Sequence, residues 1–285
     1  MKKIIFLFSI IAILSGCGLT PVQQEAVSRF AKASGAIGEI SASSFSQSRD
    51  AVIKMNVMSI AVNGTGDIKN LDGPLDPDRI VQRISATTSL KSYGELLLAL
   101  AENTQEAELK EASDNFVDSF KSVSNRKLTN EQLESLGIIV REIGGLLVEY
   151  KKAQAIKKIV LETEDDVQLI CTLLENEFDK HYPGTAMVFN DAITRLRADA
   201  NIALSEEKGI QNRLIAIEAY QFAITNKEKL DDLAKRIKSL VSSLKKANTQ
   251  LVGAIKNESH SISDIRAMGA QFKELSDAIR VFSGK

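Results

Sequence analysis

The fold of this 285-residue chain is decided by residues 21–62, which read PVQQEAVSRFAKASGAIGEISASSFSQSRDAVIKMNVMSIAV. Small or apolar side chains recur along this stretch at intervals of about 3.6 residues, which is the period of an α-helix. Pro21 suits the first turn of a helix, and Thr20 before it suits the N-cap. Residues 63–66, with the sequence NGTG, favour a helix end. We therefore predict one long amphipathic helix over residues 21–62.

The stretches that follow this helix continue the helical period. Asp76 and Pro77 provide an N-cap and a first-turn proline for a second helix, which we expect to run to about residue 125. Thr129 and Gln132 have the spacing of a capping box that starts a third helix. The pattern of the third helix weakens at residues 163–166, with the sequence TEDD, which either cap a fresh helix or lie in a kinked continuation.

A further long helix is predicted from near residue 185 to about residue 255, with Gly209 as its weakest point. The apolar side chains expected to form its buried face are Ile210, Leu214, Ile217, Ile224, Leu233, Ile237, Leu240, Leu244 and Leu251. A last, shorter helix is expected over residues 262–282. The sequence has no strand-like alternation of useful length.

The composition fits a folded chain of long helices. Aromatic residues make up 5% of the chain, Trp is absent and there are 4 Pro, whereas 44% of the residues are hydrophobic and 26% are charged. Because short connections make successive helices antiparallel neighbours, we predict an all-α, elongated bundle of long antiparallel amphipathic helices with coiled-coil-like packing. No Pro-, Ser- or Gly-rich linker divides residues 21–285, so this range is predicted to be a single domain.

The N-terminal residues indicate export. Two lysines after Met1 precede an apolar run over residues 4–14, which has the length of a signal-peptide core and is too short to span a bilayer. The run ends in Leu14-Ser15-Gly16-Cys17, which resembles the lipobox of bacterial lipoproteins. The resemblance implies that residues 1–16 are a signal peptide. It also implies that Cys17 receives a diacylglyceryl thioether and that its new amine is acylated, with palmitate as the expected acyl group.

The same resemblance predicts a place in the cell envelope. Gly18 follows the lipidated residue, whereas an Asp at this position favours inner-membrane retention in enterobacterial-type lipoproteins. The implied location is the outer membrane with the body of the protein in the periplasm, or the outer face of the plasma membrane in a single-membrane bacterium. Residues 17–20 are the lipidated Cys and a short tether, so the first helix begins close to the membrane.

The two cysteines of the chain are expected to have separate roles. Because Cys17 is committed to lipid, no internal disulfide is predicted. Cys171 shares one helical face with Val167, Leu174 and Phe178, so we predict that it is a buried core residue and not a reactive thiol.

No constellation in the sequence predicts catalysis. The chain has 2 His and lacks the motifs of zinc, nucleotide and serine-hydrolase sites. The most enzyme-like group is Asp179, His181 and Tyr182. However, a His near a helix C-terminus interacts favourably with the helix dipole, and this explains His181 without any catalytic role. The formal charge of -1 is too mild to indicate a nucleic-acid partner. We therefore predict no catalytic residues, no metal and no cofactor.

Residues 63–78 form the one clear loop, and they carry Asp67, Asp72, Asp76 and Asp78. Oxygen ligands of this kind suit Ca²⁺, but the EF-hand spacing is absent. Asp72 and Asp76 also have simple alternative roles as turn and N-cap residues. A loop of this length between long helices is a candidate contact surface, so we select the four aspartates as candidate binding residues.

Several glycines interrupt the predicted helices. They are Gly35, Gly38, Gly137, Gly144 and Gly145. Each costs about 1 kcal/mol relative to Ala in a helix interior, so we expect them to mark close helix–helix approach. A hinge or a membrane-active segment is the alternative.

Together these features predict a lipid-anchored envelope protein that acts as a non-catalytic binding or scaffold module. It is expected to reach the membrane through the lipid on Cys17 and to bind another envelope protein, and self-association stays open. A membrane-active protein of the helical pore-former type is the main alternative. An enzyme centred on Asp179, His181 and Tyr182 is less favoured.

Overall fold

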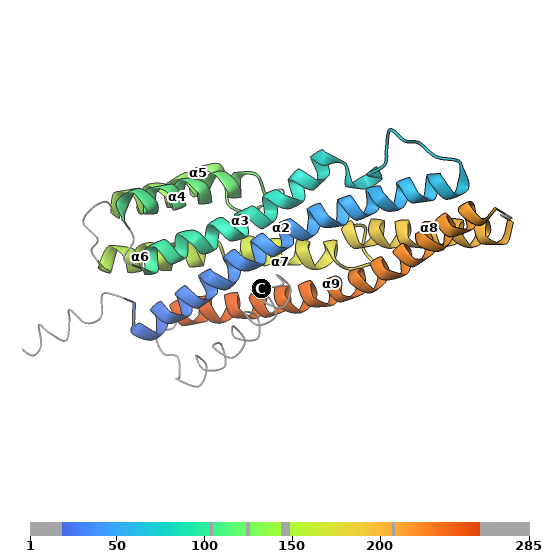
Figure 1. Cartoon of the computed structure of the whole chain (residues 1–285). Coiled ribbons are helices and arrows are strands. Elements are labelled where there is room, and N and C mark those ends of the chain that lie inside the picture. The colour runs from blue at the N-terminus through green and yellow to red at the C-terminus, as the bar shows by residue number, and fades with distance from the viewer. Residues whose placement is uncertain (1–18, 103–104, 124–125, 144–148, 207–208, 257–285) are drawn as a thin grey trace, which may run out of the picture. The chain divides into compact units, whose positions relative to one another are not determined.

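The computed structural model of the chain describes residues 19–102, 105–123, 126–143, 149–206 and 209–256 (Figure 1). Its α-helices are α2 (Pro21–Asn63), α3 (Pro77–Ala101), α4 (Glu106–Lys121), α5 (Asn130–Ile143), α6 (Glu149–Glu162), α7 (Glu164–Glu177), α8 (Thr185–Glu206) and α9 (Ile210–Lys256). A short 3-10 helix, η1, spans Gly73–Leu75. The described residues contain no strand, and the predicted all-α class is confirmed. The helix predicted over residues 262–282 lies outside the described residues.

The chain forms two compact units. Unit 1 is built from Met1–Gly38, Thr88–Leu169 and Ser243–Lys285, and unit 2 from Glu39–Thr87 and Ile170–Ser242. The borders between the units fall inside α2, α3, α7 and α9 and not in loops. The single domain expected for residues 21–285 stays a prediction.

The start of α2 confirms the predicted N-cap. The backbone N–H of Gln23 donates to Oγ1 of Thr20 (3.2 Å), and the backbone N–H of Thr20 donates to Oε1 of Gln23 (3.0 Å). This reciprocal pair is a capping box, which satisfies two backbone donors at the helix start. The amide nitrogen of Gln23 also donates to the carbonyl of Ala254 in α9 (3.0 Å), so the first turn of α2 is tied to the end of α9 within unit 1.

The single helix predicted up to about residue 125 is wrong, because the chain breaks into α3 and α4. Tyr93 of α3 lies 6.3 Å, centroid to centroid, from both Phe116 and Phe120 of α4. The hydroxyl of Ser89 donates to the carbonyl of Ser119 (2.8 Å), so α4 runs back along α3. A continuous helix would separate these aromatic rings, and burying them against each other outweighs the helical hydrogen bonds that the break removes.

The helix α5 begins at the predicted capping box. The backbone N–H of Thr129 donates to Oε1 of Gln132 (2.8 Å), and the backbone N–H of Gln132 donates to Oγ1 of Thr129 (3.2 Å). The expected close approach is found at Gly137, where a Cβ would lie 2.8 Å from Cγ2 of Val117 in α4. Gly144 and Gly145 lie outside the described residues.

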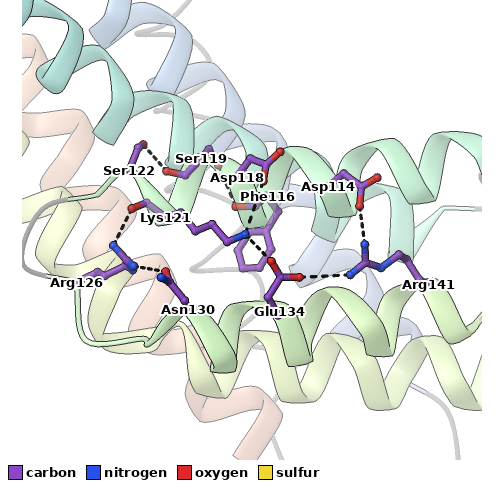
Figure 2. A network of polar contacts seen from close by, with 10 residues as sticks. All are labelled: Asp114, Phe116, Asp118, Ser119, Lys121, Ser122, Arg126, Asn130, Glu134 and Arg141. Carbon is purple, nitrogen blue, oxygen red and sulfur yellow. Dashed lines mark hydrogen bonds and ion pairs between the residues drawn. The ribbon is translucent and has the colours of Figure 1, made fainter.

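Figure 2 shows the charged side chains that join α4 to α5. Lys121 of α4 pairs with Glu134 of α5, and Arg141 of α5 lies 3.2 Å from Asp114 and 3.6 Å from Glu134. The four charges alternate in sign across the helix pair. Each pair is partly exposed, so its contribution to stability is small, and its main effect is to set how α4 and α5 align.

The third predicted helix is wrong as a single helix, because its range holds α5, α6 and α7, and α5 packs against α6. Its predicted weak point is a kink between α6 and α7. The helical hydrogen bonds continue through the kink at Thr163. Its backbone N–H donates to the carbonyl of Ile159 (3.0 Å), and its carbonyl accepts from the backbone N–H of Val167 (2.9 Å). Asp166, which is fully buried, does not cap α7. Its carboxylate accepts the backbone N–H groups of Lys127 (2.6 Å) and Leu128 (3.0 Å), and so it holds the connection before α5.

The long helix predicted over residues 185–255 is also wrong, because it is divided into α8 and α9. The division falls at the predicted weak point, since α9 starts immediately after Gly209. The guanidinium of Arg197 in α8 lies 5.7 Å from the ring centroid of Tyr220 in α9, so the two helices pair. Elsewhere in unit 2, Cys171 is buried, as predicted, and the rings of Phe45 and Phe178 stack at 5.0 Å.

The predicted buried face of the last long helix is wrong at its start. Ile210 is 88% exposed, Leu214 is 50% exposed and Ile217 is 41% exposed. The buried side chains of these turns are instead Ala216, Ala219 and Ala223. From Leu230 onward the large apolar residues do face the core, including Ile237, Leu240, Leu244 and Leu251. The alanines allow close packing, and they leave the larger side chains on the opposite face of the helix.

Candidate functional site

The loop that follows α2 belongs to unit 2, and it is the feature of that unit least explained by core packing (Figure 1). Gly64 has a φ of 70°, Gly66 of 150° and Gly73 of 54°. Residues other than glycine rarely adopt these values, so the path of the loop depends on glycine at these positions. At Gly66 a Cβ would also collide with the side chain of Ile60.

Two side chains shape the outer part of the loop. Oδ1 of Asn63 accepts the backbone N–H of Thr65 (2.8 Å), and Oδ1 of Asp67 accepts the backbone N–H of Lys69 (2.8 Å). Both are turns in which a short polar side chain replaces a backbone acceptor. The conformation around residues 65–69 is therefore encoded locally.

The inner part of the loop is fastened to α2. Arg49 donates to Oδ2 of Asp72 (2.7 Å) and to the carbonyl of Leu75 (3.1 Å). The amide of Asn56 donates to the carbonyl of Leu71 (2.6 Å), and the side chain of Leu75 is fully buried. These contacts hold residues 71–75 on the body of unit 2, so the loop leaves and rejoins the helices at defined points.

The four aspartates selected from the sequence are not brought to a common point by any contact. Asp67 shapes a turn, and Asp72 pairs with Arg49. Asp76 caps α3 by accepting the backbone N–H of Arg79 (3.1 Å), as predicted, and Asp78 lies exposed in the first turn of α3. Within the described ranges no three His, Cys, Asp or Glu side chains are grouped so that they could hold a metal ion. A binding role for the aspartates stays a prediction.

The side chain that the loop presents to solvent is Ile68, which sequence reasoning missed. It is 73% exposed, while its neighbours Asp67 and Lys69 are also exposed. The signal was present in the sequence, because Ile68 is the single large apolar residue between Asn63 and Leu71. We call residues 64–72 the display loop.

The group with the most enzyme-like composition lies at the end of α7. His181 is exposed, and its backbone N–H donates to Oδ1 of Asp179 (2.9 Å). Oδ2 of Asp179 lies 3.4 Å from Nζ of Lys238. The backbone hydrogen bond from His181, and then Lys238, hold the pKa of Asp179 below its ordinary value. The segment thus forms a turn that ends α7, with its carboxylate directed to the backbone and to a lysine.

Cys17 lies outside the described residues, but its surroundings match a known family model. Residues 1–17 match the prokaryotic membrane lipoprotein lipid attachment site. The chain carries a lipoprotein anchor. No curated protein and no solved structure matches the chain. None of the helices in the described part of the chain is long and apolar enough to cross a bilayer. The lipid attachment site supports attachment of the chain to the membrane through lipid on Cys17.

Proposed function

We propose that this lipoprotein acts without catalysis, as a binding module that presents the display loop to another protein of the cell envelope. The observation that carries the proposal is the exposure of Ile68 at the outer part of a loop that begins at the end of α2 and is fastened to α2 again through residues 71–75. A loop that has a defined shape but contributes little to the core is suited to contact with a partner.

The physical argument concerns the free energy of binding. A loop whose conformation is already set by Asn63, Asp67 and Arg49 loses little conformational entropy when a partner binds. Fully burying an exposed Ile side chain contributes roughly 1.5–3 kcal/mol, and somewhat less for Ile68, which is already partly covered. The partner surface that fits is an apolar pocket with polar groups at its rim, since charged Asp67 and Lys69 flank Ile68.

We propose the outer membrane, with the body in the periplasm, as the location. The support is Gly18 directly after the lipidated Cys17, a position where Asp favours inner-membrane retention in enterobacterial-type lipoproteins. Separation of the two membranes by density, with protease added to intact cells, tests both parts of this proposal. Recovery in the inner membrane, or cleavage by external protease, contradicts it.

The binding proposal is tested by photo-crosslinking in cells that make the lipidated protein, with the crosslinker placed at Lys69. We expect one discrete envelope protein to be captured. Ile68→Asp should weaken binding of that purified partner by roughly ten- to hundred-fold, because the apolar contact is lost. The matched control is Val81→Asp in α3, where an apolar side chain is 60% exposed outside the loop. Equal effects of the two substitutions, or none from Ile68→Asp, contradict the proposal.

A membrane-active role is the second candidate, and the exposed apolar side chains at the start of α9 favour it. Release of a dye from liposomes, with the mature chain lacking lipid, separates the two roles. A binding module releases no dye. Release that Leu214→Asp abolishes would support the membrane-active role instead.

A further inference from the structure

The first four turns of α9 carry two opposite faces. Ala216, Ala219 and Ala223 are buried against unit 2, and Ile210, Leu214 and Ile217 are exposed. Positions 210, 214 and 217 are separated by four and then three residues, so they form one straight row on the helix surface. We call these three residues the α9 stripe.

We propose that the α9 stripe packs against the α9 stripe of a second copy of this chain, with the two helices parallel. Spacings of four and three residues are those of the d and a positions of a heptad, which places Ile210 and Ile217 at d and Leu214 at a. In a parallel pair each of these side chains meets its own counterpart. The next a position is Gln221, a polar residue, so the apolar contact is limited to the three residues of the stripe.

The charges beside the α9 stripe are complementary to the same charges on a second copy. Arg213 precedes the a position and so occupies g, and Glu218 follows the d position and so occupies e. Both side chains are exposed, and neither pairs with another residue in the described part of the chain. In a parallel pair a g residue lies beside the e residue of the partner five positions further on, which joins Arg213 of each copy to Glu218 of the other.

The same charges argue against the antiparallel arrangement. There the g positions of the two helices share one flank and the e positions share the other. Arg213 would then lie on the flank of its own counterpart, and so would Glu218. Like charges would face each other on both sides, so the charge pattern selects the parallel pair.

The lipid anchor favours such an encounter. Two copies held in one membrane through Cys17 are confined to a surface, which raises their effective concentration relative to free diffusion. A contact of three apolar side chains from each copy and two ion pairs is too small to hold free chains together, and confinement to one membrane offsets this. This inference is independent of the partner proposed for the display loop.

The test is disulfide trapping of the full-length lipidated protein in its own membranes. Ile217→Cys places one thiol at the d position, and a disulfide requires Cα atoms about 4.4–6.8 Å apart. We expect a covalent dimer on mild oxidation. Lys229→Cys, an exposed position of α9 off the stripe, is the matched control and should give none. No dimer from Ile217→Cys, or equal trapping from both variants, overturns the proposal.

Charge reversal then tests the register. In the Ile217→Cys background, Arg213→Glu and Glu218→Arg should each reduce trapping by roughly five-fold, because an attraction becomes a repulsion on both flanks. The double reversal should restore it. A yield of covalent dimer that is unchanged by these substitutions, or that does not recover in the double variant, overturns the parallel register. Capture of an envelope protein through Ile68, measured in the same strains, reports separately on the display loop.

Discussion

Gly94 of α3 lies so close to Ala31 of α2 that a side chain on Gly94 would collide with the carbonyl of Ala31. A Cβ at Gly94 would also lie 2.8 Å from the backbone nitrogen of Gly35. In unit 1, therefore, the two helix backbones touch each other at this point, and no side chain separates them.

Gly94→Ala should destabilise unit 1 by about 1–3 kcal/mol, because backbone atoms cannot move aside as a flexible side chain can. The matched control is Gly35→Ala, where a Cβ meets nothing within 4 Å. There the substitution should stabilise the protein by up to about 1 kcal/mol through higher helix propensity. Denaturant unfolding of the detergent-solubilised lipoprotein measures both. Equal changes in the free energy of unfolding would show that the close contact at Gly94 does not affect stability.

Asp166→Asn should cost about 1–3 kcal/mol, because one of the two backbone N–H groups of Lys127 and Leu128, the latter buried, loses its charged acceptor. The adjacent Asp165 is exposed and pairs with Nζ of Lys127 at 3.1 Å. Asp165→Asn should therefore cost under about 1 kcal/mol. Amide hydrogen exchange gives a second measure, since only Asp166→Asn should speed exchange at Leu128. Unchanged protection there would contradict the assignment.

Because of Glu134, the free energy of unfolding should fall in acid. The hydrogen bond and charge of Lys121, followed by Arg141, hold the pKa of Glu134 below its ordinary value of 4.5. Because the carboxylate is favoured in the folded state, its contribution is present above pH 4.5 and is lost as the pH falls through the lower folded-state pKa. Glu134→Gln should flatten this part of the stability profile. Lys121→Met should raise the pKa of Glu134 toward 4.5, as followed by NMR titration; a pKa that stays low would refute the role of Lys121.

Gly18→Asp should move the protein to the inner membrane in an enterobacterial-type host, because sorting there depends on the residue after the lipidated Cys. Gly18→Ser is the control and should leave the distribution unchanged. Density separation of the membranes, followed by immunoblotting, gives the result. Identical distributions of the two variants would remove the support for an outer-membrane location.

Helix starts could be predicted because they depend on neighbouring residues. Thr20, Asp76 and Thr129 all cap helices as their local sequence requires. The same holds for the lipid attachment site, which is a contiguous motif. The α6–α7 kink at Thr163 was also visible as a weakening of the helical period.

Helix breaks and buried faces could not be predicted in the same way, because they depend on residues far apart in the sequence. The break after α3 follows from the packing of Tyr93 on Phe116 and Phe120. At the start of α9 an outward Ile210 and an inward Ala216 reverse the order that hydrophobicity alone suggests. In the display loop, the sequence pointed to the four aspartates, and the exposure of Ile68 became evident only from the structure.

The hydrogen bond from Gln23 to Ala254 connects residues 231 positions apart, and both belong to unit 1. An exported chain crosses the membrane from its N-terminus, so the segment beside the lipid is the first to arrive outside the cytoplasm. Its partner in α9 arrives only after nearly all of the remaining chain has crossed. The contact between the first turn of α2 and the end of α9 can therefore form only after most of the chain has been exported.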